Sequence, residues 1–376
     1  MLLQKVDCHL GLTDRISGII ADPRDPIRIV HQQRDLLAQR IYSLALGYEG
    51  LNDQDSLRND PALLASIKKH TDQEQPLGSS PTLCRLENRI TDDELAKLSK
   101  IFVELFLESH DTPPSQIIID IDATDDPTHG NQVGNYFNGF YDHYCFLPLY
   151  FFCGDHLLWS QLRTSKTGGA HGALAIFDDL VKRIRRQWLK VEIILRGDAG
   201  FYGPKLLRYC DRHKLKYIFG FSSNKKLKKM SRSIAVASKL FFKDGGSQES
   251  FRLFGEYQYK TKSWEQPRKV IVKAERLPDG KNIDGKENTR YIVTNLEGTP
   301  QELYEDIYCA RGDMENRIKE QQLMLFADRT SCHDFSANRF RLFLSSCAYV
   351  LFETLRRTAL KDTKYEKAQC STARFV

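Results

Sequence analysis

Apolar residues in the first part of the chain recur at the spacing of a helix. Between residues 27 and 46 their spacing follows roughly the period of a helix with one buried face. Pro61 marks the start of a second predicted helix, and TDDE at Thr91 has the form of a capping box at the start of a third. The pattern therefore predicts a helical module over residues 1–110.

Short apolar runs typical of buried strands alternate with helical segments from residue 111 to residue 221. IIIDI at 117–121 and VEIIL at 191–195 each predict a strand. The aromatic stretch that follows the first of them predicts two antiparallel strands that turn near His143 to Phe146, and residues 170–188 predict a helix. Strands and helices in this order indicate a mixed α/β sheet.

The pattern changes again after residue 221. A basic run leads into segments that alternate apolar and polar residues, and this alternation is typical of antiparallel strands. We predict an all-β insertion over residues 222–297. Helical spacing returns over 298–376, which would complete the α/β core begun in 111–221 with one polar helix and a final apolar helix, FRLFLSSCAYVLFETLRR.

Composition narrows the class of protein only a little. The 376 residues suffice for two or three domains, and the formal charge of +6 is a mild bias towards anionic partners. Nine cysteines without a C-x-x-C pair argue against a disulfide framework or a thiolate zinc site and favour a reducing cytoplasm. No apolar run reaches the roughly eighteen residues of a membrane span. Two basic runs, VKRIRRQWLK and NKKLKKMSRSIAVASKL, suit either DNA contact or a solvated helix face.

Three acidic residues stand out by their position. Asp122 and Asp198 end apolar strand-like runs, and Glu315 lies in a predicted helix that reads Y-x-x-R-x-x-x-E. Steps of three and four place Tyr308, Arg311 and Glu315 on one helical face. Three separated carboxylates are what a two-metal phosphoryl-transfer site requires.

Each of these residues also has an ordinary structural interpretation. Asp120 shares a strand face with Asp122 and is an alternative first ligand, and the DDPTHG that follows indicates a turn. Asp198 could cap a turn or helix. Trp264 could stack on an unpaired base or pack in a core, and the second is the stronger expectation. The spacings among His129, His143 and His171 match no compact zinc site, so these histidines are expected in turns or at the surface.

The motifs together resemble those of the DDE transposases of bacterial insertion sequences. The segments IDATDDPTHG, RGDAGFY and ARGDMENRIKEQ are similar to the corresponding motifs of the insertion sequence 1380 group. The resemblance implies a ribonuclease H-like core interrupted by the β-rich insertion, with Asp122, Asp198 and Glu315 as catalytic metal ligands. It also implies that Tyr308 and Arg311 contact phosphates of the transposon end. A lysine is expected seven residues after the glutamate, where this chain has Gln322, and Lys319 on the same face is a candidate substitute.

Activity and partners follow from the same resemblance. It implies cut-and-paste transposition with two Mg²⁺ ions, for which Mn²⁺ substitutes, by hydrolysis at the element ends and strand transfer to target DNA. The partners would be terminal inverted repeats, target DNA and a second copy of the chain, at the nucleoid in a bacterial cytoplasm, with residues 1–110 as a DNA-binding module and no membrane. Compared with the family pattern, the chain is expected to be shortened at both ends.

Two other functions remain in competition with active transposition. One is a catalytically inactive remnant that only binds DNA, which Gln322 and the shortened ends favour and the three intact carboxylates oppose. The other is a hydrolase that acts on sugars through a carboxylate pair, which the basic runs and the Tyr-Arg-Glu face oppose.

Overall fold

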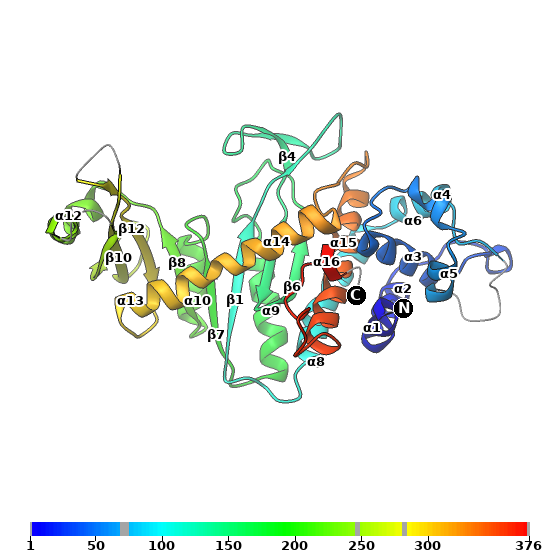
Figure 1. The fold of residues 1–376 in the computed structure, drawn as a ribbon, viewed down its shortest axis with the longest axis horizontal. Helices are drawn as coiled ribbons and strands as arrows, with labels where there is room; N and C mark the ends of the chain where they lie inside the picture. Colours follow the sequence, from blue (N-terminus) through cyan, green and yellow to red (C-terminus); the bar gives the residue numbers. More distant parts are fainter. Residues whose placement is uncertain (1, 68–74, 245–248, 280–283, 374–376) are drawn as a thin grey trace. The chain divides into compact units, whose positions relative to one another are not determined.

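The computed structural model describes residues 2–67, 75–244, 249–279 and 284–373 (Figure 1). The chain forms two compact units, each of which has most of its contacts within itself. Unit 1 comprises Met1–Thr112, Ala123–Gly169 and Glu315–Val376, and unit 2 comprises Pro113–Asp122 and Ala170–Met314. Within the described ranges no helix combines the length and apolar character required to cross a bilayer.

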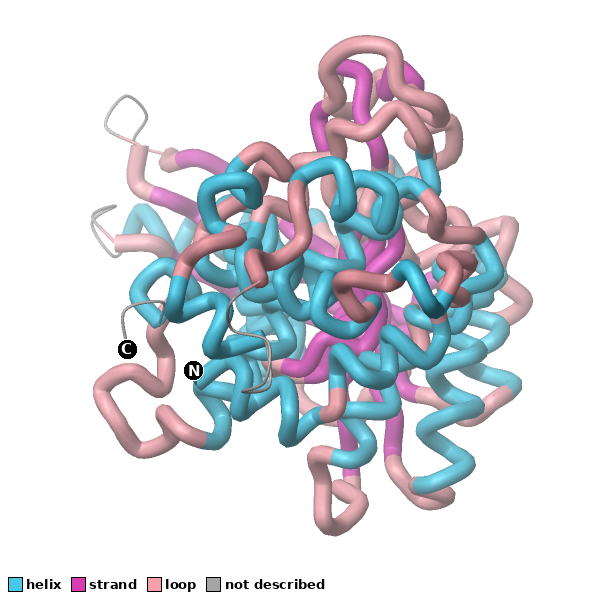
Figure 2. Tube along the Cα trace, turned by 90° about the vertical axis from the view of Figure 1, so that its right-hand side faces the viewer, coloured by secondary structure: helices cyan, strands magenta, loops and turns pink. Residues whose placement is uncertain are grey.

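The N-terminal part of unit 1 is helical, as predicted, and Figure 2 draws the helices of the chain in cyan. Thr91 forms the predicted capping box with Glu94, and Pro61 begins its helix. The helix expected from Ile27 begins later, because Asp25 caps a separate short turn, η1 (Pro26–Arg28). The helices are α1 (Leu2–Leu10), α2 (Leu12–Ile19), α3 (Gln33–Leu46), α4 (Asp53–Leu57), α5 (Pro61–Ile67), α6 (Ser80–Asn88), α7 (Asp92–Leu98) and α8 (Ile101–Glu108).

A long helix, α15 (Phe335–Thr358), forms the centre of unit 1. Its apolar residues surround the helix on nearly every side, and such a helix is stable only when it is enclosed. Helices α1 and α3 and the strand β6 (His156–Gln161) pack against it. A short helix, α16 (Cys370–Ala373), follows it along the chain.

The strands of unit 1 form two antiparallel groups. In the first, β5 (Leu149–Cys153) pairs with β6, and in the second the order is β2 (Asp126–Pro127), β4 (His143–Phe146), β3 (Tyr136–Asn138). The predicted turn near His143 to Phe146 is wrong, because these residues are β4 itself. The chain turns earlier, where the Asn138 side chain accepts hydrogen bonds from the backbone of Phe140 and Tyr141.

Unit 2 contains a large mixed sheet, which confirms the predicted mixed α/β class. The strands β1 (Gln116–Ala123), β7 (Glu192–Gly197) and β8 (Lys216–Phe221) run parallel, and β12 (Arg290–Thr294) continues the sheet antiparallel to β8. The strand β10 (Arg268–Leu277) pairs with β12 and also with β9 (Phe251–Tyr259) and β11 (Lys286–Glu287). The helices α9 (Ala173–Gln187) and α10 (Pro204–Arg212) precede β7 and β8 along the chain.

The segment predicted as an all-β insertion begins with helices instead. Its basic run forms α11 (Lys225–Met230) and α12 (Arg232–Asp244), and α12 packs against β9 and β10. Asn224 caps α11, and the side chains of Leu227 and Phe242 are buried while most of the lysines stay in solvent. The many lysines and arginines of this run masked its helical spacing, so these helices were not predicted from the sequence.

Candidate functional site

Asp122 and Asp198 follow the last paired residues of two adjacent parallel strands. The register of β1 and β7 pairs Asp120 with Arg196 and Ile121 with Gly197, so the two aspartates occupy the next matched position. Neighbouring strands lie about 4.8 Å apart, which brings these two residues side by side at the carboxyl edge of the sheet. This edge is where ligands bind in α/β sheets.

Gly197 permits the close approach of the two strands just before this edge. A Cβ atom at this position would lie 2.8 Å from Ile121 Cγ2, closer than real Cβ atoms come. Beyond it, one carboxylate oxygen of Asp198 accepts a hydrogen bond of 2.8 Å from the backbone N–H of Gly200. Asp198 therefore orders its own turn, and the N-cap of α10 is Gly203 rather than Asp198.

Asp120 forms a buried ion pair rather than facing solvent. The Arg196 guanidinium donates hydrogen bonds of 2.5 Å and 2.8 Å to its two oxygens, and the side chains are 2% and 8% exposed. Arg196 Nη1 also donates to the backbone carbonyl of Ile307. The pair thus links two strands of the sheet to the segment that carries the Y-x-x-R motif.

That segment is not the uninterrupted helix that the spacing predicted. After α13 (Pro300–Glu302), the chain forms a π-helical turn, η2 (Leu303–Tyr308), and a 3₁₀ turn, η3 (Cys309–Arg311), before α14 (Gly312–Leu325). Residues three apart eclipse one another in a 3₁₀ turn, so Tyr308 and Arg311 still share a face. A π turn within a helix is frequent at functional sites.

Arg311 and Tyr308 both reach the carboxyl edge of the sheet. Arg311 Nη1 lies 3.3 Å from Asp122 Oδ2, with both side chains largely buried. The Tyr308 hydroxyl lies beside Gly220 of β8, where a Cβ atom would come within 2.6 Å of it and within 2.8 Å of the Ala199 backbone nitrogen. Burial raises the pKa of Tyr308, and Arg311 partly offsets the rise.

The remaining residues of the motif helix belong to unit 1. Glu315 is half-buried in the first turn of α14, and Lys319 is exposed. Gln322 Nε2 donates a hydrogen bond of 3.1 Å to the backbone carbonyl of Asp125 and lies 3.5 Å from Thr124 Oγ1. The roles predicted for Glu315 and Lys319 stay predictions.

Trp264 lies in the core of unit 2. Its side chain is 4% exposed, and its ring centre is 5.3 Å from that of Phe221 and 6.1 Å from that of Tyr259. The Arg268 guanidinium lies 5.7 Å from the ring. This placement favours packing over base stacking for Trp264.

The donor chemistry at the sheet edge suits a hard divalent cation. Asp122 and Asp198 offer carboxylate oxygens, which Mg²⁺ prefers, and Arg311 already supplies one positive charge to Asp122. In the described part of the chain, no group of three or more His, Cys, Asp or Glu side chains is arranged to hold a metal ion.

Carboxylates at adjacent strand ends, with an arginine beside them, are suited to an enzyme that transfers phosphoryl groups. The family model described as "Transposase DDE domain group 1" matches residues 1–376, and the chain belongs to this family. Among solved structures it is similar to a piggyBac transposase, described as a synaptic complex with hairpin DNA, with a TM-score of 0.45 and 11% identity over 96% of this chain and 75% of that chain. No curated protein matches. The family match confirms the resemblance to DDE transposases.

Proposed function

We propose that this transposase hydrolyses DNA at the ends of a mobile element and joins the freed ends to target DNA. Asp122, Asp198 and Glu315 are its catalytic carboxylates. The observation that carries the proposal is the matched position of Asp122 and Asp198 at the ends of β1 and β7, with Arg311 at 3.3 Å from Asp122. The burial of Asp120 against Arg196 supports Asp122 as the first ligand.

The three carboxylates would hold two Mg²⁺ ions, with Mn²⁺ as a substitute. Such ions, when bound, activate an attacking oxygen and stabilise the leaving oxygen of an in-line phosphoryl transfer. Arg311 is placed to bind a phosphate oxygen beside Asp122, because a guanidinium matches phosphate geometry. The small residues of the turn from Gly197 to Gly200 let a DNA backbone approach the protein backbone.

Other contacts to DNA follow from the family and the sequence. Tyr308 and Lys319 contact the phosphate backbone, and residues 1–110 form a DNA-binding module. The partners are terminal inverted repeats and target DNA, on which two copies of the chain assemble in a bacterial cytoplasm. The core of this arrangement, residues 111–221 and 298–376, is ribonuclease H-like, and 222–297 interrupts it.

The test is cleavage of DNA that carries the gene's own flanking sequences, with Mg²⁺ or Mn²⁺. Wild type should cut, and Asp198→Asn should lose at least a hundredfold in rate while it keeps its fold and its DNA affinity. Glu297→Gln is the matched control, since it removes an exposed carboxylate from the same unit. Equal cleavage by wild type and Asp198→Asn would refute the assignment.

A second candidate function is DNA binding without catalysis. Gln322 favours it, because the family pattern places a lysine at this position and here the side chain binds the Asp125 backbone instead. Tight binding with no cleavage by wild type at any metal concentration would establish this alternative.

A further inference from the structure

Exposed aromatic side chains concentrate in one short segment of unit 1. Of the fifteen large hydrophobic side chains that are exposed in the described residues, five fall between Val133 and Tyr144. Tyr136, Phe137, Phe140 and Tyr144 are 42%, 53%, 87% and 56% exposed. A patch of exposed aromatic side chains of this kind marks an interaction site.

Phe137 and Tyr144 form a cross-strand pair on the outer face of the small sheet. They are matched in the register of β3 and β4, and their rings meet edge to face with centres 5.6 Å apart. On the opposite face, Tyr136 is matched with the buried Cys145, so the alternation of the strands fixes which rings point outwards. We call Phe137 and Tyr144 the aromatic pair.

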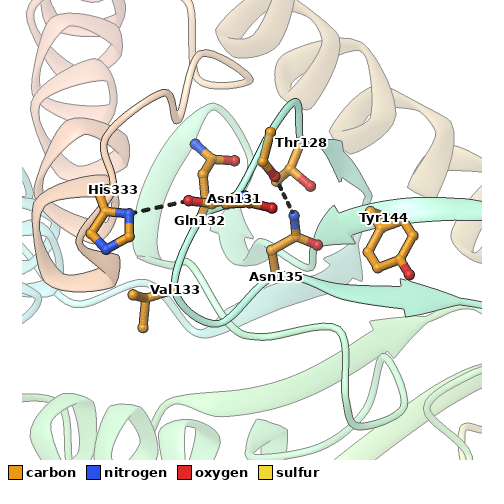
Figure 3. Close-up of a pocket in the computed structure, with 8 residues that line it drawn as sticks. Thr128, Asn131, Gln132, Val133, Asn135, Tyr144 and His333 are labelled. Carbon is orange, nitrogen blue, oxygen red and sulfur yellow. Dashed lines mark hydrogen bonds between the residues drawn. The ribbon is translucent and has the colours of Figure 1, made fainter.

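A hollow of about 470 Å³, lined by several amide side chains, adjoins the aromatic pair. Figure 3 shows amide side chains, among them Asn131 and Asn135, between His333 at one side and Tyr144 at the other. Two hydrogen bonds connect the segments that line the hollow. Val133 N–H donates to the His333 carbonyl at 3.0 Å, and a nitrogen of the His333 ring lies 3.1 Å from the Asn131 carbonyl oxygen.

Two side-chain oxygens in the walls of the hollow have a fixed orientation. Gln132 Nε2 donates to the carbonyls of Thr330 and Cys332, and Asn135 Nδ2 donates to the Gly130 carbonyl. Because these nitrogens face carbonyls, the amide oxygens must point the other way. Gln132 Oε1 and Asn135 Oδ1 are buried and have no hydrogen-bond partner among the described residues. Buried polar atoms of this kind are rarely left without a partner.

We propose that the aromatic pair and this hollow bind the bases of an unpaired stretch of DNA. The proposal rests on the proposed function in that it takes DNA as the substrate. Flat rings suit base stacking, and amides suit base edges. Aromatic residues are also enriched in protein interfaces, so a protein partner is the alternative outcome of the test.

The test compares two labelled DNAs of the same sequence by fluorescence anisotropy, one fully paired and one with an unpaired gap. The buffer contains EDTA, so that no cleavage occurs. Wild type should bind the gapped DNA more tightly. Phe137→Ala with Tyr144→Ala should lose this preference by roughly tenfold or more while it binds the paired DNA as before. Phe241→Ala, which removes a ring that is 54% exposed in unit 2 and lies outside the proposed DNA contacts, should change neither affinity.

Tyr144→Trp separates stacking from a merely structural role, since it keeps a flat ring and should keep the preference. No preference in wild type, or a preference that survives the double substitution, would overturn the proposal. So would a change of oligomeric state in the double variant with unchanged DNA preference, because the face would then contact protein. Failure of the cleavage assay leaves this binding measurement intact, so the two proposals fail separately.

Discussion

Arg196 holds Asp120 through two hydrogen bonds across the β1–β7 pair and holds the Ile307 carbonyl with the same guanidinium. One buried side chain therefore connects β1, the strand that carries Asp122, with the π turn that ends on Tyr308. A π turn shifts carbonyls out of the regular helical hydrogen bonds, and Arg196 supplies a donor for one of them. The position of the motif thus depends on a residue outside the motif.

Arg196→Met should destabilise the protein strongly. It leaves the Asp120 carboxylate buried without a partner, which costs about 3–5 kcal/mol when one half of a buried ion pair is removed. Urea unfolding followed by circular dichroism measures the loss. Arg208→Met, which breaks the exposed pair with Glu265, should cost at most about 1 kcal/mol. Equal losses of unfolding free energy for the two variants would show that the buried pair stabilises the protein no more than the exposed one.

Asp120→Asn and Asp122→Asn should fail in different ways. Asp120→Asn weakens the buried contact with Arg196 and should lower the unfolding free energy, with cleavage reduced only in proportion to the folded fraction. Asp122→Asn should keep more of its stability, because the amide oxygen can still accept a hydrogen bond from Arg311, and should lose metal-dependent cleavage by at least a hundredfold. Unfolding curves and cleavage rates of both variants show which of the two aspartates is needed for cleavage and which for stability. If Asp122→Asn were folded and active, Asp122 would not be the first metal ligand.

The parts of the fold that local chemistry determines could be predicted from the sequence. The capping box at Thr91 and the apolar runs that became β1 and β7 depend on neighbouring residues only. The turn at Asn138 was missed although Asn-Gly between two alternating runs is a strong hairpin signal. There the many aromatics of the stretch obscured the short polar turn.

The parts that tertiary contacts determine could not be predicted. The π turn at Leu303–Tyr308 is bonded by Arg196, which is more than a hundred residues away in sequence. No pattern within the motif itself predicts this turn. The register that sets Asp122 beside Asp198 likewise follows from strand pairing over a long loop. Candidate residues could be named from the sequence, whereas their pairing with Arg196 and Arg311 required the structure.

Asp126 should make the protein less stable as the pH rises from about 4 to about 7. Burial raises the pKa of its carboxyl to about 7, so the folded protein keeps a proton that the unfolded chain releases near pH 4. Stability falls wherever the folded state binds more protons, here by up to about 4 kcal/mol across that interval. Asp126→Asn cannot ionise and can still accept the Thr330 hydroxyl, so its stability should vary less with pH.

The measurement for Asp126 is the unfolding free energy at several pH values between 4 and 8, for wild type and for Asp126→Asn. The difference between the two curves isolates this group from all others that titrate. Glu297→Gln, at an exposed carboxylate, should run parallel to wild type. Parallel curves for Asp126→Asn and wild type would mean that Asp126 titrates normally in the folded protein.

Gln322→Lys should strengthen DNA binding without disturbing the fold. A lysine at this position can donate to the Asp125 carbonyl as Gln322 does, and it adds the charge that the family pattern has here. One further phosphate contact should steepen the dependence of log Kd on log salt by about one. Leu323→Lys is the matched control, because it adds the same charge one position along α14 on a side chain that is 71% exposed. Anisotropy titrations at several salt concentrations compare the variants. An equal gain in DNA affinity from both variants would indicate a general effect of charge. A gain in affinity from Gln322→Lys alone, accompanied by faster cleavage, would identify position 322 as a site where this chain lacks a DNA contact.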